Sequence, residues 1–396
     1  MAGSAQEPGR DGLGQLVRNL HLRGGSASRA ELTELLGCGR SVMGYLLGEL
    51  TDRGLVIIDK AGGQAATTDG GRPSHRVLVA DTAPTVVAAQ LSADTVTAAR
   101  VRLGGHMSGR IERPVPNGDV TGAVDVLCEL ITEVADGVPN LLGIGLAVPS
   151  PIRRSDGYAP AALHLGWPAV PLGELMRERL PEHTLSLGND ANLAALAEYR
   201  HGAGRDAVQL VYLTTAHVGL GGAVVSEGRL FQGARGYAIE PGHITVDVHG
   251  QACPCGSTGC LEIEVDHRGL LRAMGRTDVP LEAITSVVAD VLAAATDGDR
   301  AAVAAVERLG RHLGTGLATL VNITDTDRIV LGGTLGQIYL LRPEIVDDQV
   351  GRRSFLVGAE EIPIVPGELP DGELLGAAEL ALQPLLDNPK RVLTTR

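Results

Sequence analysis

Apolar residues in the first eighty positions repeat first with the spacing of helices and then with that of strands. The repeat predicts a helix from Leu13 and a second helix from Ser28, with Glu31 placed three residues later as in a capping box. A third helix is predicted over residues 40–52, followed by apolar strands near residues 54–58 and 77–80. The predicted inward faces of the three helices are Leu13, Leu16, Val17, Leu20, Leu32, Leu35, Val42, Met43, Leu46, Leu47 and Leu50. Residues 1–12 are small, polar and rich in glycine, and we expect them to be disordered.

Two short helices joined by a turn near residues 37–39, and then a two-stranded hairpin, predict a winged helix-turn-helix over residues 13–80. The last helix of such a domain enters the major groove with its first turn toward the base edges. Arg40, Ser41 and Tyr45 lie there, while Arg72 and Arg76 on the wing would reach the minor groove or phosphates. The alternative is a small helical domain for protein contacts, in which Arg40 is only solvated.

From Thr85 the pattern changes to apolar strands alternating with amphipathic helices. Residues 86–101 predict two strands joined by a tight turn, residues 121–136 a helix, and residues 141–151 a buried strand that ends in a loop. A long helix at 299–322, a strand from Arg328 and a closing helix from about Asp371 follow later. The alternation predicts an α/β fold, divided into one lobe at 85–200 and a second at 206–386.

Three of the five cysteines, Cys253, Cys255 and Cys260, crowd into eight positions, and His243 precedes them by ten residues. Three thiolates and one imidazole form a complete tetrahedral set for zinc, which leaves no open position, so the ion would be structural. An odd number of cysteines clustered beside a histidine also suits a reducing cytoplasm. The alternative is three buried cysteines and an unrelated histidine.

The residues around this cluster read E-x-G-H and then C-x-C-G-x-x-G-C-x-E, which resembles the signature of the ROK family, named for repressors, open reading frames and kinases. The resemblance implies that His243 and the three cysteines bind zinc. It also implies that Glu240, His243 and Glu262 contact a bound sugar. The Gly-Arg-Pro at residues 71–73 is similar to the wing of ROK repressors, and the two lobes resemble the fold shared by sugar kinases, Hsp70 and actin.

Residues 189–192 read Asn-Asp-Ala-Asn, which matches a further ROK motif. By that resemblance Asn189 and Asp190 are sugar-binding positions, and Asp190 is the catalytic aspartate of the kinases. The same two residues would cap a helix at 191–200, and both roles are compatible. His164 stands where the family often has Asn, and Ile239 where it usually has Gly, so the identity of the ligand is open; a packed or solvated His164 is the alternative.

The parts that hold phosphate in ROK kinases are altered. Their D-x-G-G-T turn corresponds to residues 90–94, which read Gln-Leu-Ser-Ala-Asp, and Val218 replaces a Thr or Ser before Gly219. Glycine turns let backbone amides approach phosphate, so their loss predicts that kinase activity is gone and that Asp190 is a vestigial base.

The charge of the chain is unevenly distributed. The net charge is −13 over 396 residues, yet the first 80 residues carry 9 basic and 8 acidic groups. Contact with nucleic acid is therefore expected only from the N-terminal segment. No apolar run reaches the roughly 18 residues that a membrane span needs, so neither a membrane nor a secreted location is expected.

Together these features predict a cytoplasmic transcriptional regulator that acts as a repressor on double-stranded DNA and is controlled by a sugar or phosphosugar. A homodimer or homotetramer would require an inverted-repeat operator. The alternatives are an ATP-dependent kinase of hexose or N-acetylmannosamine that carries a DNA-binding domain, and a ligand-independent DNA-binding protein controlled by a partner protein.

Overall fold

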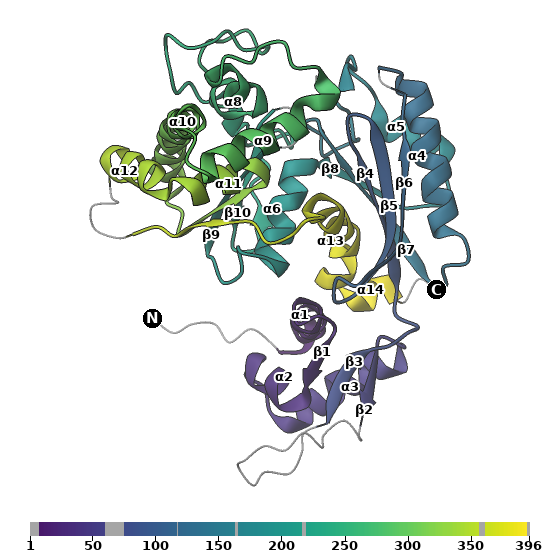
Figure 1. The fold of residues 1–396 in the computed structure, drawn as a ribbon. Helices are drawn as coiled ribbons and strands as arrows, with labels where there is room; N and C mark the ends of the chain where they lie inside the picture. Colours follow the sequence, from purple (N-terminus) through teal and green to yellow (C-terminus); the bar gives the residue numbers. More distant parts are fainter. Residues whose placement is uncertain are drawn as a thin grey trace. The chain divides into compact units, whose positions relative to one another are not determined.

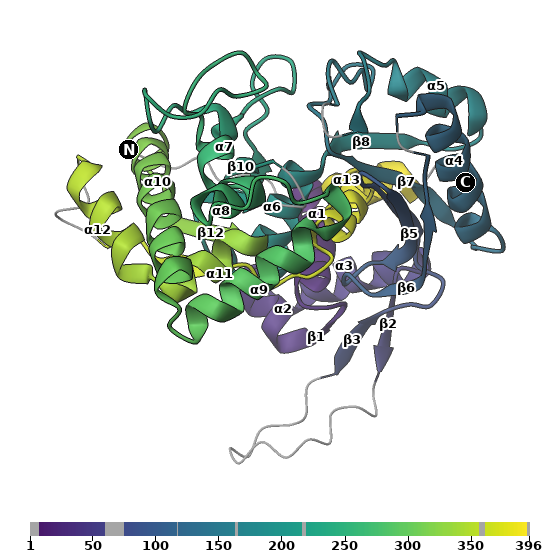
Figure 2. The same cartoon turned by 45° about the horizontal axis from the view of Figure 1, so that its top comes forward.

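The computed structural model in Figures 1 and 2 describes residues 8–59, 75–116, 118–162, 165–215, 219–355 and 361–393. The chain divides into two compact units. Unit 1 contains the chain up to Ala147, Gly173–Leu187 and everything from Ala377; unit 2 contains Val148–Leu172 and Gly188–Gly376. The boundaries of these units differ from those of the predicted lobes 85–200 and 206–386, and the two lobes stay a prediction.

The N-terminal part of unit 1 has the predicted order of three helices and a small sheet (Figure 1). Its elements are α1 (Pro8–Leu22), β1 (Ser26–Ser28), α2 (Arg29–Leu35), α3 (Arg40–Asp52), β2 (Val56–Asp59) and β3 (Arg76–Val79), with the strands ordered β1-β3-β2. The capping box of Ser28 and Glu31 is present at the start of α2. The core consists of one stripe from each helix, including Leu16, Leu20, Leu32, Met43, Leu47 and Leu50.

Three expectations for this part are corrected. Helix α1 begins at Pro8, inside the segment 1–12 expected to be disordered, and proline suits the first turn of a helix because its missing N–H would be unpaired there. Leu35 is 46% exposed and Val42 is 39% exposed, although both were expected to face inward. A core between three short helices accepts only a narrow stripe from each, and on α3 that stripe is filled by Met43, Leu46, Leu47 and Leu50.

The rest of unit 1 is built on a five-stranded sheet with the order β6-β5-β4-β7-β8. The strands are β4 (Thr85–Leu91), β5 (Thr95–Arg102), β6 (Met107–Pro114), β7 (Leu141–Val148) and β8 (Leu185–Asn189). Strands β4 and β5 form the expected hairpin, and β4 pairs in parallel with β7. Helix α4 (Val120–Ala135) packs on one face of this sheet, and Figure 1 shows α5 (Leu172–Arg179) beside it. Helix α13 (Gly372–Asp387) contributes its residues from Ala377 onward to unit 1, and α14 (Pro389–Leu393) follows it.

Unit 2 is built on a second sheet, ordered β11-β10-β9-β12-β13. Its strands are β9 (Gln209–Thr215), β10 (Gly221–Ser226), β11 (Arg229–Leu230), β12 (Arg328–Gly332) and β13 (Ile364–Pro366). Alternate residues of β9 enter two separate cores, as the pleat of a strand requires. Val211 and Leu213 pack with α10 (Arg300–Thr324), whereas Leu210 and Tyr212 pack with α6 (Asp190–His201).

The other helices of unit 2 surround this sheet, and several match the predicted ranges. They are η3 (Pro241–His243), α7 (Leu261–Val265), α8 (His267–Ala273), η4 (Leu281–Ala283), α9 (Ile284–Thr296), α11 (Gly333–Leu341) and α12 (Pro343–Arg353). The long helix expected at 299–322 is α10, and the closing helix expected from residue 371 is α13. The α/β fold class is therefore confirmed.

Candidate functional site: a cysteine–histidine cluster beside a group of carboxylates

The structure brings the four predicted metal ligands together in unit 2. One donor atom from each of His243, Cys253, Cys255 and Cys260 lies within 4.8 Å of the others. The Sγ atoms of Cys255 and Cys260 are 3.7 Å apart, and the Sγ of Cys253 is 3.8 Å from Nδ1 of His243. Zinc–sulfur bonds of about 2.3 Å in a tetrahedron place two sulfurs on the order of 3.8 Å apart. The donor set and its spacing therefore fit a tetrahedral metal site.

The loop that carries the cysteines is held by glycines and by a buried carboxylate. Gly259 has a φ of +63°, and a Cβ atom there would overlap the carbonyl oxygen of Asp247. The backbone N–H of Gln251 donates to Oε1 of Glu264 over 2.8 Å, and the Glu264 side chain is only 3% exposed. Glu264 also lies 3.7 Å from Arg308 of α10. The loop is thus fixed to the helices of unit 2 rather than by the cysteines alone.

Asn189 and Asp190 occupy the start of α6, where β8 ends. The side-chain oxygen of Asn189 accepts from the backbone N–H of Asn192 over 3.0 Å, which makes Asn189 the helix N-cap. Its Nδ2 donates to Oδ1 of Asp190 over 3.0 Å, and the backbone N–H of Ala191 donates to the same oxygen over 2.7 Å. The capping role is therefore present, and it fixes the direction of the Asp190 carboxylate.

Carboxylates gather around Asp190. The pKa of Asp190 is raised from 3.8 to about 7, mainly by burial and also by the charges of Glu373 and Glu240, against the opposing hydrogen bond from Ala191. Glu240 keeps some exposed surface, yet burial of its carboxylate raises its pKa; His243 opposes this shift and Glu262 adds to it. Within unit 2 the charge of Glu240 therefore acts on Asp190, and the charges of His243 and Glu262 act on Glu240. Burial also raises the pKa of Glu373, which the sequence reasoning missed because a glutamate in the first turn of a helix is ordinary.

Glu262 connects this group to the glycine segment that follows β9. Its Oε2 accepts from the backbone N–H of Leu220 over 3.1 Å. His164 and Val218 lie outside the described residues. The turn at residues 92–94 is closed by a hydrogen bond of 2.8 Å from the N–H of Ser92 to the oxygen of Thr95, and none of its residues has a positive φ. This turn therefore has no conformational need for glycine.

The predicted DNA-binding residues of α3 form one exposed face. Arg40 and Ser41 are exposed, and Tyr45 is 59% exposed. Arg76 begins β3 and is exposed; its Nε donates to Oγ of Ser26 over 2.7 Å. Arg72 lies outside the described residues.

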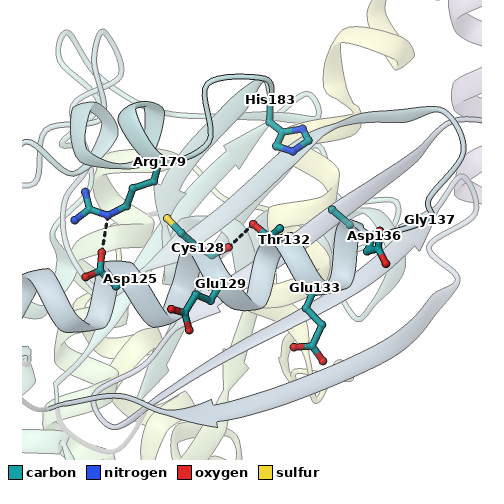
Figure 3. A pocket seen from close by; sticks show the side chains of 10 residues that line it. Asp125, Cys128, Glu129, Thr132, Glu133, Asp136, Gly137, Arg179 and His183 are labelled. Carbon is teal, nitrogen blue, oxygen red and sulfur yellow. Dashed lines mark hydrogen bonds and ion pairs between the residues drawn. The ribbon is translucent and has the colours of Figure 1, made fainter.

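A surface groove of about 880 Å³ lies in unit 1 between α4 and α5 (Figure 3). It is lined by Asp125, Cys128, Glu129, Thr132, Glu133, Ala135, Asp136, Gly137, Arg179 and His183. Nε of Arg179 donates to Oδ1 of Asp125 over 2.7 Å, as the dashed line in Figure 3 marks. None of the predicted site residues lines this groove, which is the solvent face of an amphipathic helix.

No helix in the described part of the chain combines the length and the apolar character that crossing a membrane would require.

Proteins with similar sequences include repressors and a kinase. The xylose repressor of Caldicellulosiruptor bescii is 26% identical in an alignment of 383 positions that covers 92% of this chain and 93% of that protein. The N-acetylglucosamine repressor of Escherichia coli O157:H7 is 26% identical in an alignment of 377 positions that covers 92% of this chain and 90% of that protein. The glucokinase of Halalkalibacterium halodurans is 32% identical in an alignment of 279 positions that covers 65% of this chain and 83% of the enzyme.

Solved structures show the same division. A ROK family transcriptional regulator, described as a homolog of the Escherichia coli MLC protein, matches with a TM-score of 0.78 and 23% identity, covering 97% of this chain and 98% of its own. A ROK family glucokinase from Streptomyces griseus, in complex with glucose and AMPPNP, matches with a TM-score of 0.63 and 28% identity, covering 76% and 99%. The sequence profile of the ROK family matches residues 87–384, and the chain belongs to the ROK family.

Proposed function

We propose that this protein is a transcriptional regulator that represses by binding DNA and that responds to a sugar or sugar derivative. The observation that carries the proposal is the exposed face of α3, with Arg40, Ser41 and Tyr45, on a domain that precedes the residues matched by the ROK family profile. Two relatives that cover 92% of the chain are named xylose repressor and N-acetylglucosamine repressor. The chain thus combines a surface suited to DNA with a ROK domain.

In this function α3 lies in the major groove, and its first turn faces the base edges. Arg40 can bond both acceptors of a guanine, and Ser41 and Tyr45 supply further polar contacts. Arg72 and Arg76 on the wing hold phosphates or enter the minor groove. A two-fold dimer or a tetramer of such dimers reads an inverted repeat.

The metal of this function is one structural zinc ion per chain, held by His243, Cys253, Cys255 and Cys260. Bound zinc supplies a cross-link between η3 and the loop that leads into α7. Since Glu240 precedes η3 and Glu262 lies in α7, the cross-link orients both glutamates.

The effector binds at Asn189, Asp190, Glu240, His243 and Glu262, with His164 as a further contact. The described carboxylates that surround Asp190 favour an uncharged, hydroxyl-rich ligand, because a carboxylate accepts hydrogen bonds from sugar hydroxyls and repels a phosphate. Xylose, glucose and N-acetylglucosamine, rather than their phosphates, are the first compounds to test.

The second candidate function is an ATP-dependent sugar kinase. A specific observation favours it: a carboxylate with a pKa of about 7 is well suited to take a proton from a hydroxyl at neutral pH. The stretch at residues 90–94 argues against it, because it has Gln90 in place of the first Asp of the kinase motif and contains no glycine. A coupled assay with ATP and each sugar tests this candidate, and turnover above about 1 s⁻¹, typical of enzymes of this kind, would support it.

The test of the main proposal is a titration of the purified protein against its own upstream DNA at fixed salt. It is done with and without xylose, glucose, N-acetylglucosamine and the phosphate of each. We expect specific binding that one uncharged sugar changes several-fold. Binding no tighter than to unrelated DNA would contradict the repressor function, and tight binding that no compound alters would favour control by a partner protein.

A further inference from the structure

Helix α13 belongs to both units. Its first residues, Gly372 to Gly376, lie in unit 2, whereas the helix from Ala377 onward lies in unit 1. The helix is continuous across this boundary. A displacement of its first turn would be passed to its later turns, because hydrogen bonds from each residue to the fourth one before it join successive turns.

The first turn of α13 packs directly on α6. A Cβ atom at Gly376 would overlap the carbonyl oxygen of Leu193, and a Cβ atom at Gly372 would lie 3.6 Å from that of Ala194. Helix α6 begins with Asp190. The close backbone contact means that a ligand which shifts the start of α6 also presses on α13. Glu373, in the same turn of α13, adds its charge to the surroundings of Asp190.

A later turn of α13 holds the helix-turn-helix part of unit 1. Oε1 of Glu379 lies 2.7 Å from Nε2 of His21, in the last turn of α1, and both side chains are fully buried. The backbone N–H of Gly104 donates to Nδ1 of His21 over 2.8 Å. Since Nδ1 accepts, the ring proton sits on Nε2, which donates to Glu379. Three separate segments of unit 1 are thus joined at one imidazole.

We propose that His21 and Glu379 are positioning residues that couple the effector site to the DNA-binding helices through α13. The coupling rests on the proposed function. A buried polar pair has few acceptable arrangements, because a displaced donor or acceptor is left without a partner. The pair therefore holds α1 in a defined position relative to α13, and movement of α13 moves α1.

The same interface offers a matched control. Nη2 of Arg18 lies 2.9 Å from Oδ1 of Asp387, and these side chains are 47% and 55% exposed. An exposed ion pair contributes little and tolerates many arrangements. Arg18→Ala therefore removes a contact between α1 and α13 without removing the buried one.

The experiment compares wild-type protein, Glu379→Met, Glu379→Gln, His21→Leu and Arg18→Ala. For each, operator affinity is measured with and without whichever of xylose, glucose and N-acetylglucosamine alters wild-type binding. Calorimetry measures sugar binding directly, and thermal melting checks the fold. For the wild type we expect the operator affinities with and without the sugar to differ by a ratio within the roughly 5- to 150-fold range of allosteric coupling. Glu379→Met and His21→Leu should bring that ratio to within about twofold of one while sugar affinity is kept.

Glu379→Gln keeps an oxygen that accepts from His21 and should retain most of the response, as should Arg18→Ala. A full response in Glu379→Met and His21→Leu, with normal folding, would overturn the coupling. If neither variant folds, amide hydrogen exchange of α1 is measured in the wild type with and without the sugar. Protection of α1 that the sugar leaves unchanged overturns the coupling, and protection that the sugar changes supports it. If no sugar changes the operator affinity of the wild type, the result contradicts the proposed function and not the role of His21 and Glu379.

Discussion

The Asp190 carboxylate has a structural role at the start of α6 and a proposed role in ligand binding, and burial affects its charge in both. As part of the start of α6 it accepts the backbone N–H of Ala191, and as a ligand contact it would accept a sugar hydroxyl. Its ordinary pKa is 3.8, whereas burial and the neighbouring glutamates raise it to about 7. In the folded protein the carboxyl therefore changes its charge near neutral pH.

The first prediction concerns the pH dependence of effector binding. Below pH 7 the proton on Asp190 occupies one acceptor position, so sugar affinity should fall as the pH drops, by up to about tenfold per unit. Calorimetric titration between about pH 6 and pH 8.5 measures this. Asp190→Asn is the control, because an amide does not titrate here; it should bind weakly and with a flat pH profile. A wild-type profile as flat as that of the variant would contradict the prediction.

Raised carboxyl pKa values also have a cost in stability. The unfolded chain ionises Asp190 near pH 3.8 and the folded chain near pH 7, so the charge opposes folding increasingly as the pH rises between these values. Asp190→Asn is therefore expected to raise the melting temperature at pH 8 and to leave it nearly unchanged at pH 4. Scanning calorimetry at both values tests the sign, and a lower melting temperature at pH 8 would refute it.

Arg40 is the residue of α3 whose loss should cost most in DNA binding. Arg40→Ala is expected to weaken operator binding by about 1–3 kcal/mol and to relax the preference at one base position. Arg113→Ala is the matched control, since Arg113 pairs with Glu133 in the sheet part of unit 1. Fluorescence anisotropy on the operator and on single-base variants compares the two, and an equal loss for both would exclude a specific role for Arg40.

Among the elements, the cysteine loop is the one that the proposed zinc ion would stabilise. Cys260→Ser is expected to lower the zinc content from about one ion per chain to near zero and to lower the melting temperature by on the order of 5 °C. Cys38→Ser, at a cysteine outside the cluster, should change neither. Metal analysis with thermal melting decides, and a fully stable Cys260→Ser protein without zinc would remove the structural role.

Elements with strong apolar periodicity were predictable, and those held by backbone pairing alone were not. Helices α4, α6 and α10 agree with the predicted ranges to within two residues, because each begins at a capping side chain and α4 and α10 also have an apolar stripe. Strand β1 was missed: Ser26, Ala27 and Ser28 show little apolar alternation, and the strand exists because it pairs with β3. The presence of glycine at position 44 within α3 has a packing reason that the sequence does not reveal. A Cβ atom there would lie 3.1 Å from the guanidinium of Arg29.

The candidate site was predictable as far as it rests on short motifs. The cluster of His243 and three cysteines spans 18 positions, and its geometry follows from one loop. Contacts between distant segments were not predictable: Glu379 lies 358 positions from His21, and nothing in either local sequence indicates the other. Tertiary packing alone brings such pairs together, so a single sequence does not reveal them.

For the whole molecule, symmetry makes a prediction about the operator. A two-fold dimer places its two α3 helices about one helical turn apart on DNA, roughly 10–10.5 bp from centre to centre. Inserting about 5 bp between the half-sites should turn them to opposite faces and reduce affinity at least tenfold, while about 10 bp should restore part of it. Band-shift titrations on three such fragments test this, and equal affinity for all three would indicate independent monomers.

Unit 1 draws its parts from both early and late segments of the chain. Helix α1 is synthesised before α13, in which its partners Glu379 and Asp387 lie. At about 5–20 residues per second, ribosomes need on the order of 20 to 70 seconds to travel between them. During that interval the nascent helix-turn-helix lacks the support that fixes its first helix. Chains that stall before α13 would therefore lack this support for α1, and we expect them to bind an operator more weakly than chains that contain α13.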